Sequence, residues 1–551
     1  MSSLGEQTWF RSGDRSLDGW VHRPDDGRVV GALVIAAPFA HEALVTYRTI
    51  RVLAVEAARR GYVAVRFSWS GTGDSEPSPT DGDLSRAWQE DLEAAVDLAR
   101  TASGCEVVAA IGVRFGASVV AAADLPSSKR VLWEPLGGRT FLRMQSTLLK
   151  LQLPIEFPLS ADQVELCGYA LGADAAASLR SLPDPRSSWV EGVPGHVLIE
   201  DDPRRSADLF DRSPQDALVP LSTIRTILDA LDPVAEKLTP PWSPQRELVS
   251  LDVVSGRRIR QTLVLVGPDN LPGVLTQAVD GPSATTAAVF VPFAHDSKGA
   301  SRVGRATSFR LAASGIPTLR ADRRGIGDAA DPQDLGEGPA LLDSASDDIA
   351  LLARWLSEHT GKSVVGIGLC SGAWLVARAA AATPFERVIL VNNRGWTTSR
   401  RYRDRQLRIS ERERDAADVY AHTDSLTTSA SRSGGGFGRR IKRFLRFRSP
   451  YWLRYRIFSP LGLDEVPEML LRAVPKETSV SVLLGPSGDH QYWQALRGPD
   501  SLRRLMRRGH RIDVVYEPRA DHSLMSTKGL ESYLDFLDRE FDLQARPVNA
   551  G

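Results

Sequence analysis

Short apolar runs alternate with amphipathic stretches along the whole chain. The apolar runs at 33–37 and 288–291 have the length typical of buried strands. Between such runs lie stretches with apolar residues at helical spacing, for example 87–99 and 346–356. Strands that alternate with helices predict a mostly parallel sheet covered by helices on both faces.

This pattern occurs twice. Pro-Phe-Ala-His follows an apolar run at 38–41 and again at 292–295, and a Gly-x-Gly-Asp turn occurs at 71–74 and 325–328. Both landmarks recur after 254 residues, which is about a domain length and too long for a solenoid repeat. We therefore predict two tandem globular domains, residues 1–250 and residues 251–551.

The strongest chemical signal is a sharp turn in the second copy. An apolar run leads into Gly368-Leu-Cys370-Ser-Gly372, and a helical stretch follows. Glycines two positions before and after the central residue are typical of a nucleophile elbow, because they keep Cβ atoms out of a crowded strand-to-helix turn. Strained backbone costs about 1–3 kcal/mol, which a purely structural turn has little reason to keep. The elbow and the alternating pattern together predict an α/β-hydrolase fold in each half, with Cys370 as the nucleophile of the second.

In this fold the acid and the histidine follow the nucleophile in the sequence. The apolar run at 480–484 ends in a turn that carries Asp489, and the next run leads into a polar loop that carries His522. We predict that His522 takes the thiol proton and later returns it to the leaving group. Asp489 would fix the imidazole tautomer and stabilise its charged form. The start of a helix behind Cys370 and a nearby imidazolium would both favour the thiolate.

Other residues compete for these roles. Ser371 is out of frame with the glycine spacing, so we discount it as the nucleophile. His490 is an alternative base, although it lies on the wrong strand, and Asp521 is an alternative acid, although its side chain should diverge from the neighbouring histidine. Cys370 could also be a small buried hydrophobe without a catalytic role.

An oxyanion hole needs two backbone donors. The sequence predicts the N–H of Ser371 and one N–H from the Pro-Phe-Ala loop, either that of Phe293 or that of Ala294. Asp322 and Asp328 belong to the glycine-rich turn, where capping and turn hydrogen bonds are expected.

The first half has the same elbow without a nucleophile. Its sequence Gly112-Val-Arg114-Phe-Gly116 places an arginine at the central position. Its histidines come early in the half or in a strand lead-in, and none follows the last strand, which we expect near residue 245. We predict a non-catalytic first domain, in which Arg114 either binds an anion or forms an ion pair that locks the two domains together.

Composition narrows the function classes. The 551 residues are 42% hydrophobic and carry a formal net charge of zero, so no global field favours nucleic acid. Three scattered cysteines do not form a disulfide framework, and no signal peptide or membrane span is apparent. We expect a cytoplasmic protein with no cofactor and no metal site. The sequence does not predict an oligomeric state.

One segment of the second half is strongly basic. Arginines and aromatic residues are interleaved between Arg439 and Arg456, after a serine- and glycine-rich stretch at 429–436. The segment lies where α/β-hydrolases commonly insert a lid, which we place at about 395–465. It is either a solvated basic lid whose aromatics pack on the domain or a surface for an anionic substrate, carrier domain or membrane.

Both halves resemble known bacterial families. The elbow at 368–372, the following Val-Ile-Leu-Val-Asn-Asn at 388–393 and the late Ala-Asp-His at 520–522 are similar to an α/β-hydrolase-like family associated with exosortase and exopolysaccharide gene clusters. The first half resembles its companion family at 131–143 and 164–171, and that companion also tends to carry arginine at the elbow. More widely, a Gly-x-Cys-x-Gly elbow is similar to that of dienelactone hydrolases and polyhydroxyalkanoate synthases. The resemblance implies acyl chemistry without fixing the substrate.

These observations predict a Cys-His-Asp enzyme in residues 251–551. It would act on a small-molecule or carrier-bound acyl ester or thioester through a thioester acyl-enzyme, by hydrolysis or by acyl transfer. The alternative is a non-catalytic scaffold or binding protein built from two degenerate hydrolase domains.

Overall fold

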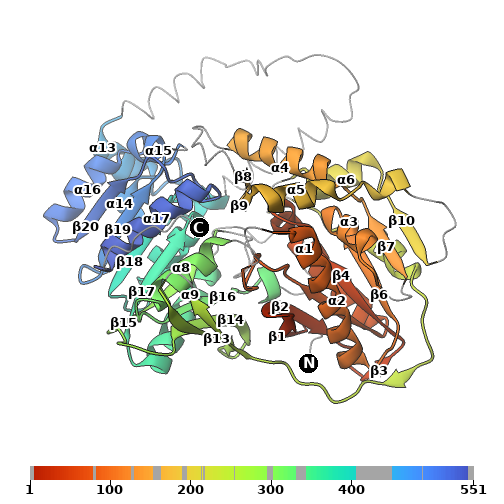
Figure 1. Cartoon of the computed structure of the whole chain (residues 1–551). Coiled ribbons are helices and arrows are strands. Elements are labelled where there is room, and N and C mark those ends of the chain that lie inside the picture. Colours follow the sequence, from red (N-terminus) through yellow and green to blue (C-terminus); the bar gives the residue numbers. More distant parts are fainter. Residues whose placement is uncertain are drawn as a thin grey trace, which may run out of the picture.

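The computed structural model describes most of the chain in two sheet-containing halves that lie side by side (Figure 1). The described residues are 5–77, 82–125, 129–152, 163–188, 195–212, 214, 217–252, 255–293, 302–329, 343–404, 449–486 and 488–543. Most of the predicted lid, the stretch 405–448, lies outside them.

The first half is built on a seven-stranded sheet of order β1-β2-β5-β4-β6-β7-β10. Its strands are β1 Glu6–Ser12, β2 Arg15–His22, β4 Gly31–Ala36, β5 Tyr62–Phe67, β6 Val108–Val113, β7 Arg130–Trp133 and β10 His196–Ile199. From β5 to β10 all neighbours are parallel, and β1 and β2 add an antiparallel edge. Two short strands, β3 Arg28–Val29 and β11 Lys237–Leu238, pair separately.

Helices cover both faces of this sheet. They are α1 His41–Arg59, α2 Leu84–Ser103, α3 Phe115–Ala122, α4 Gly138–Gln152, α5 Ala173–Ser181, α6 Pro203–Phe210 and α7 Leu221–Asp229, with a 3-10 turn at Pro185–Ser188. Alternate strand residues point to opposite faces. Val34 accordingly packs in the core under α2 and α3, whereas its neighbour Leu33 packs in the core under α1 and α7.

The second half repeats this plan with nine strands, in the order β12-β13-β14-β16-β15-β17-β18-β19-β20. The strands are β12 Glu247–Asp252, β13 Arg257–Val266, β14 Leu271–Ala278, β15 Thr286–Val291, β16 Thr318–Ala321, β17 Ser363–Leu369, β18 Arg387–Val391, β19 Ser479–Leu484 and β20 Ile512–Tyr516. From β16 to β20 all pairs are parallel. The predicted boundary at residue 250 falls inside β12.

Helices again lie on both faces of the second sheet. They are α8 Arg302–Ala312, α9 Asp343–Thr360, α10 Ser371–Ala379, α13 Tyr451–Leu453, α14 Pro467–Leu471, α15 Asp489–Ala495, α16 Gly498–Arg507 and α17 Thr527–Glu540, with a 3-10 turn at Gly327–Ala329 and a π-turn at Arg454–Phe458. One core lies under α9 and α10, and the other lies under α8 and α17. The predicted α/β-hydrolase fold is confirmed in both halves.

Pairing the two sheets strand by strand shows what the first half lacks. β4, β6, β7 and β10 take the places of β15, β17, β18 and β19, but among the described residues no strand of the first sheet takes the place of β20. The expectation of a last strand near residue 245 was wrong. Residues 247–252 form β12, which pairs with β13 of the second sheet, and the first sheet ends at β10. The first half therefore has no described strand that could deliver a histidine loop to its elbow.

The halves face each other through a reciprocal pair of buried contacts. Arg66 of β5 binds Asp328 of the second half, and Arg320 of β16 binds Asp74 of the first half with Nη2 and Oδ1 2.6 Å apart. Arg66 and Arg320 are separated by 254 residues, as are Asp74 and Asp328. Equivalent residues thus exchange partners across the interface, as in a two-fold symmetric dimer.

The first half also sends a hairpin to the second. The hairpin consists of β8 Gln163–Leu166 and β9 Tyr169–Gly172, which lie between the two halves in Figure 1. At its turn, the N–H of Gly168 donates to the carbonyl of Met525, with N and O 2.8 Å apart. Gly168 has a φ of 88°, which favours glycine.

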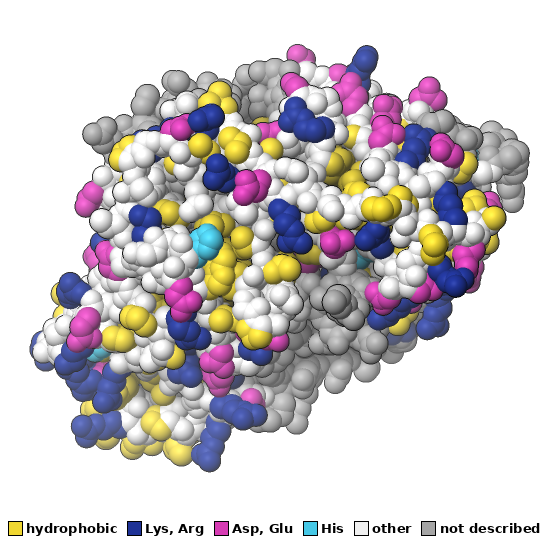
Figure 2. Space-filling model, turned by 90° about the horizontal axis from the view of Figure 1, so that it is seen from below, with side chains coloured by type: hydrophobic (Ala, Val, Ile, Leu, Met, Phe, Trp, Pro, Cys, Tyr) yellow, Lys and Arg dark blue, Asp and Glu magenta, His cyan; other side chains and the backbone are white. Residues whose placement is uncertain are grey.

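The surface agrees with the neutral net charge. Acidic and basic side chains are interspersed over the face shown in Figure 2. Among the described residues, no helix combines the length and the apolar character needed to cross a bilayer.

Candidate active site

Cys370 lies at the tight turn between β17 and α10. Its φ of 54° and ψ of −115° are strained for a residue with a side chain, and its N–H donates to the carbonyl of Val391 at 2.8 Å. A Cβ on Gly368 would lie 2.5 Å from the Cα of Ala373, and one on Gly372 would lie 2.2 Å from the carbonyl oxygen of Val291. Both glycines are therefore required by sterics, and the turn presents the thiol at the carboxyl edge of the sheet.

The structure brings the three residues of the predicted triad together. His522 Nε2 lies 3.2 Å from the sulfur of Cys370, and His522 Nδ1 lies 2.7 Å from Oδ1 of Asp489. Asp489 is the first residue of α15 and is buried, whereas Cys370 is half-buried. An imidazole between a thiol and a carboxylate can accept the thiol proton while the carboxylate stabilises the resulting charge.

Electrostatics favour the charged form of this histidine. Burial alone lowers the pKa of His522, but its hydrogen bonds to Asp489 and Cys370 and their negative charges outweigh burial and raise the pKa to about 9. At neutral pH the ring is therefore an imidazolium. The imidazolium lies beside the sulfur of Cys370, whose nucleophilic form in cysteine enzymes is the thiolate.

Two further residues support the site, and the sequence analysis assigned neither of them a role. Arg394 donates from Nε to Oδ1 of Asp489 at 2.6 Å. Asn392 is fully buried and donates from Nδ2 to the carbonyls of Asp521 and His522, at 2.9 and 3.0 Å. The sequence contained a signal for both residues, because the polar stretch 392–394 directly follows the buried strand β18. Residues that follow the carboxyl ends of parallel strands meet at one edge of the sheet, where sites commonly lie.

Asp521 builds the histidine loop and does not contact the imidazole as an acid. Its carboxylate accepts hydrogen bonds from the N–H groups of Met525 and Ser526, at 2.8 and 3.0 Å, and from the Ser526 hydroxyl. These bonds fold the chain back between His522 and α17. The alternative of Asp521 as the acid is thereby replaced by a structural role.

The other competing residues lie elsewhere. The ring of His490 lies tilted against that of Tyr516, with ring centroids 4.7 Å apart, and its Nε2 contacts Gln494. Asp322 accepts a turn hydrogen bond from the N–H of Asp328, as expected, but the Asp328 carboxylate also crosses to the first half. The expectation of a purely local role for Asp328 was therefore incomplete.

The predicted oxyanion donors are partly described. Ser371 is the first residue of α10, where the N–H is not needed for the helix ladder. Phe293 packs against the same core cluster as Cys370. Ala294 lies outside the described residues, so the choice between Phe293 and Ala294 stays open.

The elbow of the first half has the same backbone conformation, but it carries a cationic side chain in place of a nucleophile. Arg114 has a φ of 54° and a ψ of −119°, within a few degrees of Cys370. Its Nε and Nη2 donate to Oε1 of Glu42 at 3.0 and 2.8 Å, and its guanidinium lies over the ring of Phe210. Glu42 and Phe210 both belong to the first half. The buried ion pair of Arg114 therefore stabilises its own domain and does not lock the two domains together, as one alternative held.

The basic segment is described only from residue 449. There, Arg454 is buried, and its Nε donates to Asp464 at 2.5 Å. Trp452, in contrast, is 57% exposed. Neither interpretation of the segment anticipated a fully buried, paired arginine. The part between Arg439 and residue 448, with the predicted hinge at 429–436, lies outside the described residues.

Comparisons with known proteins give structural likeness alone. No protein-family model and no curated protein sequence matches the chain. Among solved structures, the chain is similar to a dienelactone hydrolase from Anabaena variabilis, with 14% identity and a TM-score of 0.33 over 54% of this chain and 98% of the other. It is also similar to an esterase from Pyrococcus furiosus, with 12% identity and a TM-score of 0.30 over 55% of this chain and 94% of the other. A carboxyl esterase from Bacillus coagulans is similar as well, with 12% identity and a TM-score of 0.30 over 53% of this chain and 98% of the other.

Proposed function

We propose that the second half transfers acyl groups from esters or thioesters to water or another acceptor, with Cys370 as the nucleophile. The observation that carries this proposal is the pair of contacts made by His522, 3.2 Å to the sulfur and 2.7 Å to Asp489. The strained elbow adds support, because it holds the thiol clear of the backbone at the start of α10.

The proposed reaction proceeds in two steps. The thiolate of Cys370 attacks the carbonyl carbon, and a C–S bond forms while the carbonyl π electrons move onto oxygen. The tetrahedral intermediate collapses, the bond to the leaving group breaks, and the leaving group takes the Nε2 proton of His522. In the second step His522 removes a proton from water or an alcohol, which attacks the thioester and releases Cys370. The N–H of Ser371 would stabilise the oxyanion in both steps.

The thiolate favours certain substrates. A tetrahedral intermediate expels the better leaving group, so a cysteine enzyme is suited to thioesters, activated esters and lactones more than to amides. A small-molecule or carrier-bound acyl donor fits this requirement. The thioester intermediate stays reactive toward alcohols and amines, so both hydrolysis and acyl transfer belong to the proposal.

We assign no catalysis to the first half. Arg114 takes the place of the nucleophile and is bound by Glu42 within a buried ion pair. No described strand of the first sheet delivers a histidine loop. The proposed role of this half is structural, as a partner that contacts the histidine loop of the second half.

Turnover of p-nitrophenyl acyl esters by matched variants tests the proposal. Cys370→Ala and His522→Ala should each lower kcat/KM by at least a hundredfold, because general base catalysis alone contributes about 10²–10⁴-fold. Cys105→Ala is the matched control, since Cys105 is a buried thiol of the first half outside the hairpin, and should retain full activity. Equal turnover by Cys370→Ala and the parent protein would support the alternative, a scaffold built from two degenerate hydrolase domains.

A second arm distinguishes hydrolysis from transfer. Adding glycerol or a primary amine at increasing concentration should divert the acyl group from water to the acceptor if the intermediate accepts such nucleophiles. The product ratio is read by chromatography. A ratio that does not change with acceptor concentration assigns the protein as a hydrolase.

A further inference from the structure

A cavity of about 240 Å³ lies where the two halves meet. The first half supplies most of its wall, from the glycine-rich turn at 70–73, from α2 and from β9. The second half supplies Arg302, Arg305 and Ala306 of α8. The cavity is thus a composite of both halves and contains none of the triad residues.

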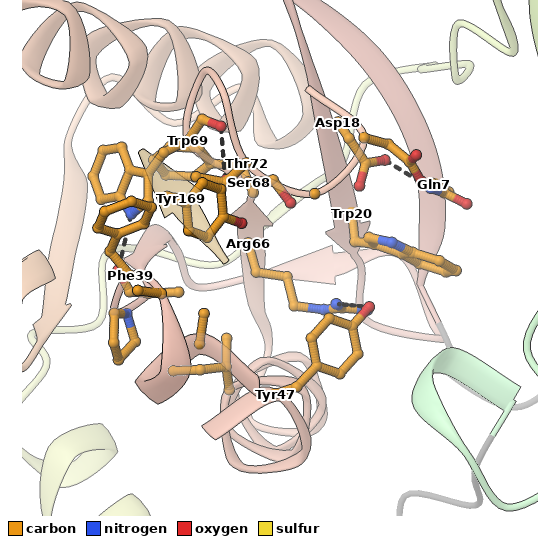
Figure 3. Close-up of a pocket in the computed structure, with 18 residues that line it drawn as sticks. Gln7, Asp18, Trp20, Phe39, Tyr47, Arg66, Ser68, Trp69, Thr72 and Tyr169 are labelled. Carbon is orange, nitrogen blue, oxygen red and sulfur yellow. Dashed lines mark hydrogen bonds between the residues drawn. The ribbon is translucent and has the colours of Figure 1, made fainter. Parts of the chain in front are cut away.

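The wall from the first half is apolar and aromatic. Phe39 lies at its centre, with its ring centroid 4.9 Å from that of Trp88 and 4.7 Å from that of Tyr169. Leu84 and Leu171 extend this surface. Figure 3, a close-up of the adjoining pocket, shows Phe39 and Tyr169 beside Trp69. Such a wall binds the apolar part of a ligand.

The wall from the second half carries a half-buried cation with one unpartnered nitrogen. The Nε of Arg305 is buried, and it has no hydrogen-bond partner among the described residues. Its guanidinium lies over the ring of Phe309, 4.1 Å from the centroid. Burial lowers the pKa of Arg305 to about 10 while nearby Asp74 opposes this effect, so the side chain stays charged at neutral pH.

Two carboxylates lie near Arg305, and each also faces another group, although neither oxygen of Asp74 makes a hydrogen bond among the described residues. Asp74 lies 2.6 Å from Nη2 of Arg320, and Glu76 accepts the N–H of Ser16 at 2.7 Å. Among the described residues, the three arginines Arg302, Arg305 and Arg320 outnumber these two carboxylates. A buried guanidinium nitrogen without a hydrogen-bonding partner is costly, and an anionic ligand could accept its hydrogen bond.

The symmetry of the interface provides an internal comparison. Arg48 and Arg51 of α1 occupy the positions of Arg302 and Arg305, and the turn 325–327 occupies that of 71–73. The space between Arg48 and the turn 325–327 is only about 20 Å³. The two places related by the repeat therefore differ in size among the described residues, about 240 Å³ beside Arg305 and about 20 Å³ beside Arg48.

We infer that this cavity binds a small anionic amphiphile, with its apolar body against Phe39, Trp88 and Tyr169 and its carboxylate or phosphate on Arg305. The volume is slightly below that of pockets for drug-sized ligands, which run from about 300 to 1,000 Å³. A short acyl chain or a single aromatic system therefore fits better than a long lipid. This inference does not depend on the proposed chemistry, since its test reads binding and not turnover.

Calorimetric titration of the full chain tests the inference with four probes. Octanoate and octyl phosphate combine a tail with an anion, octanol has only the tail, and inorganic phosphate has only the charge. We expect at least one of the two amphiphiles to bind at least tenfold more tightly than octanol and phosphate, and the tighter of them identifies the head group. Equal binding of octanol, or no binding of either amphiphile, overturns the inference.

Matched variants locate the site. Arg305→Met keeps the side-chain length and should weaken binding of the amphiphile at least tenfold, and Ala306→Leu should abolish binding by filling the cavity. Arg258→Met is the control, because Arg258 forms an exposed pair with Asp280 and does not line the cavity, and it should bind as the parent does. Undiminished binding by both Arg305→Met and Ala306→Leu overturns the inference.

The stability of Arg305→Met provides an independent check. An arginine kept for a ligand, and not for a protein partner, can be replaced without loss of stability, so the variant should unfold at the same temperature as the parent or at a higher one. A clearly lower unfolding temperature would assign Arg305 to the Asp74–Arg320 cluster as a structural residue and would contradict the inference.

Discussion

Arg66 and Asp328 form a buried ion pair that joins the two halves, and Arg320 and Asp74 form the same pair in the opposite direction. The Tyr47 hydroxyl also donates to Asp328 Oδ2, at 2.7 Å. All four charged side chains of the two pairs are at most 6% exposed. The halves therefore depend on each other to satisfy charges that neither could leave buried alone.

Removing one acid from this arrangement should destabilise the whole chain. Asp328→Ala leaves Arg66 buried without its partner, and we expect a loss of about 3–5 kcal/mol in the free energy of unfolding. Denaturation in urea, followed by circular dichroism, measures this loss. Asp280→Ala removes an exposed partner of Arg258 and should leave the unfolding curve unchanged. Equal curves for both variants would contradict the interdependence of the halves.

The charge on His522 should make stability depend on pH in a defined window. Its pKa is raised from about 6.5 to about 9 in the folded chain. A raised pKa means that the folded state holds the proton more tightly, so the contribution is complete below about pH 6.5 and is lost as the pH rises through about 9. The difference in unfolding free energy between the parent and His522→Ala should shrink over that window. A difference that is constant from pH 6 to pH 10 would refute the assignment.

The three cysteines should differ sharply in reactivity. Burial, with smaller effects from Asp521 and Glu165, raises the pKa of Cys167 to about 12, and Cys105 is also buried. Cys370, in contrast, lies beside the imidazolium of His522. At pH 7 iodoacetamide should therefore alkylate Cys370 first, as read by peptide mapping. Comparable labelling of Cys105 or Cys167 in the folded protein would argue against a thiolate at the elbow.

Glu165 should act as a positioning residue for the histidine loop. Its Oε1 accepts the N–H of Thr527 at 2.6 Å, five residues after His522, and Gly168 binds Met525 in the same loop. Glu165→Ala removes the acceptor, whereas Glu165→Gln keeps an oxygen there. We expect the alanine variant to slow alkylation of Cys370 at pH 7 several-fold and the glutamine variant to restore most of the rate.

The pH profile separates positioning from stability in this experiment. If the histidine loop moves in Glu165→Ala, alkylation should follow the profile of an ordinary thiol, rising toward pH 8.5. A purely structural role would lower the unfolding temperature and leave the profile unchanged. That result would show that the first half supports the fold of its partner without positioning His522.

The sequence predicted the features that local sterics and chain order determine. The elbow could be predicted from Gly368 and Gly372, because a Cβ at either position would collide with the backbone. His522 and Asp489 were located by their order after Cys370 and by the apolar runs before them. The alternation of strands and helices was sufficient for the fold class, since each buried strand has a clear apolar pattern.

Contacts between distant segments could not be predicted in this way. Arg66 and Asp328 belong to different domains, and no local pattern indicates that one binds the other. Arg394 and the first half's hairpin reach the site only through tertiary packing. The last strand of the first sheet was misplaced because β12 has a strand pattern but pairs with β13, and pattern alone does not determine the pairing partner.

The most direct test of the central claim is the mass of the Cys370 peptide after brief exposure to a p-nitrophenyl acyl ester. Acid quenching, proteolysis and mass spectrometry should find one acyl group on Cys370, labile to hydroxylamine as a thioester is, and none on Cys105 or Cys167. The adduct should be absent in Cys370→Ala. An unmodified Cys370 peptide during active turnover would contradict the account.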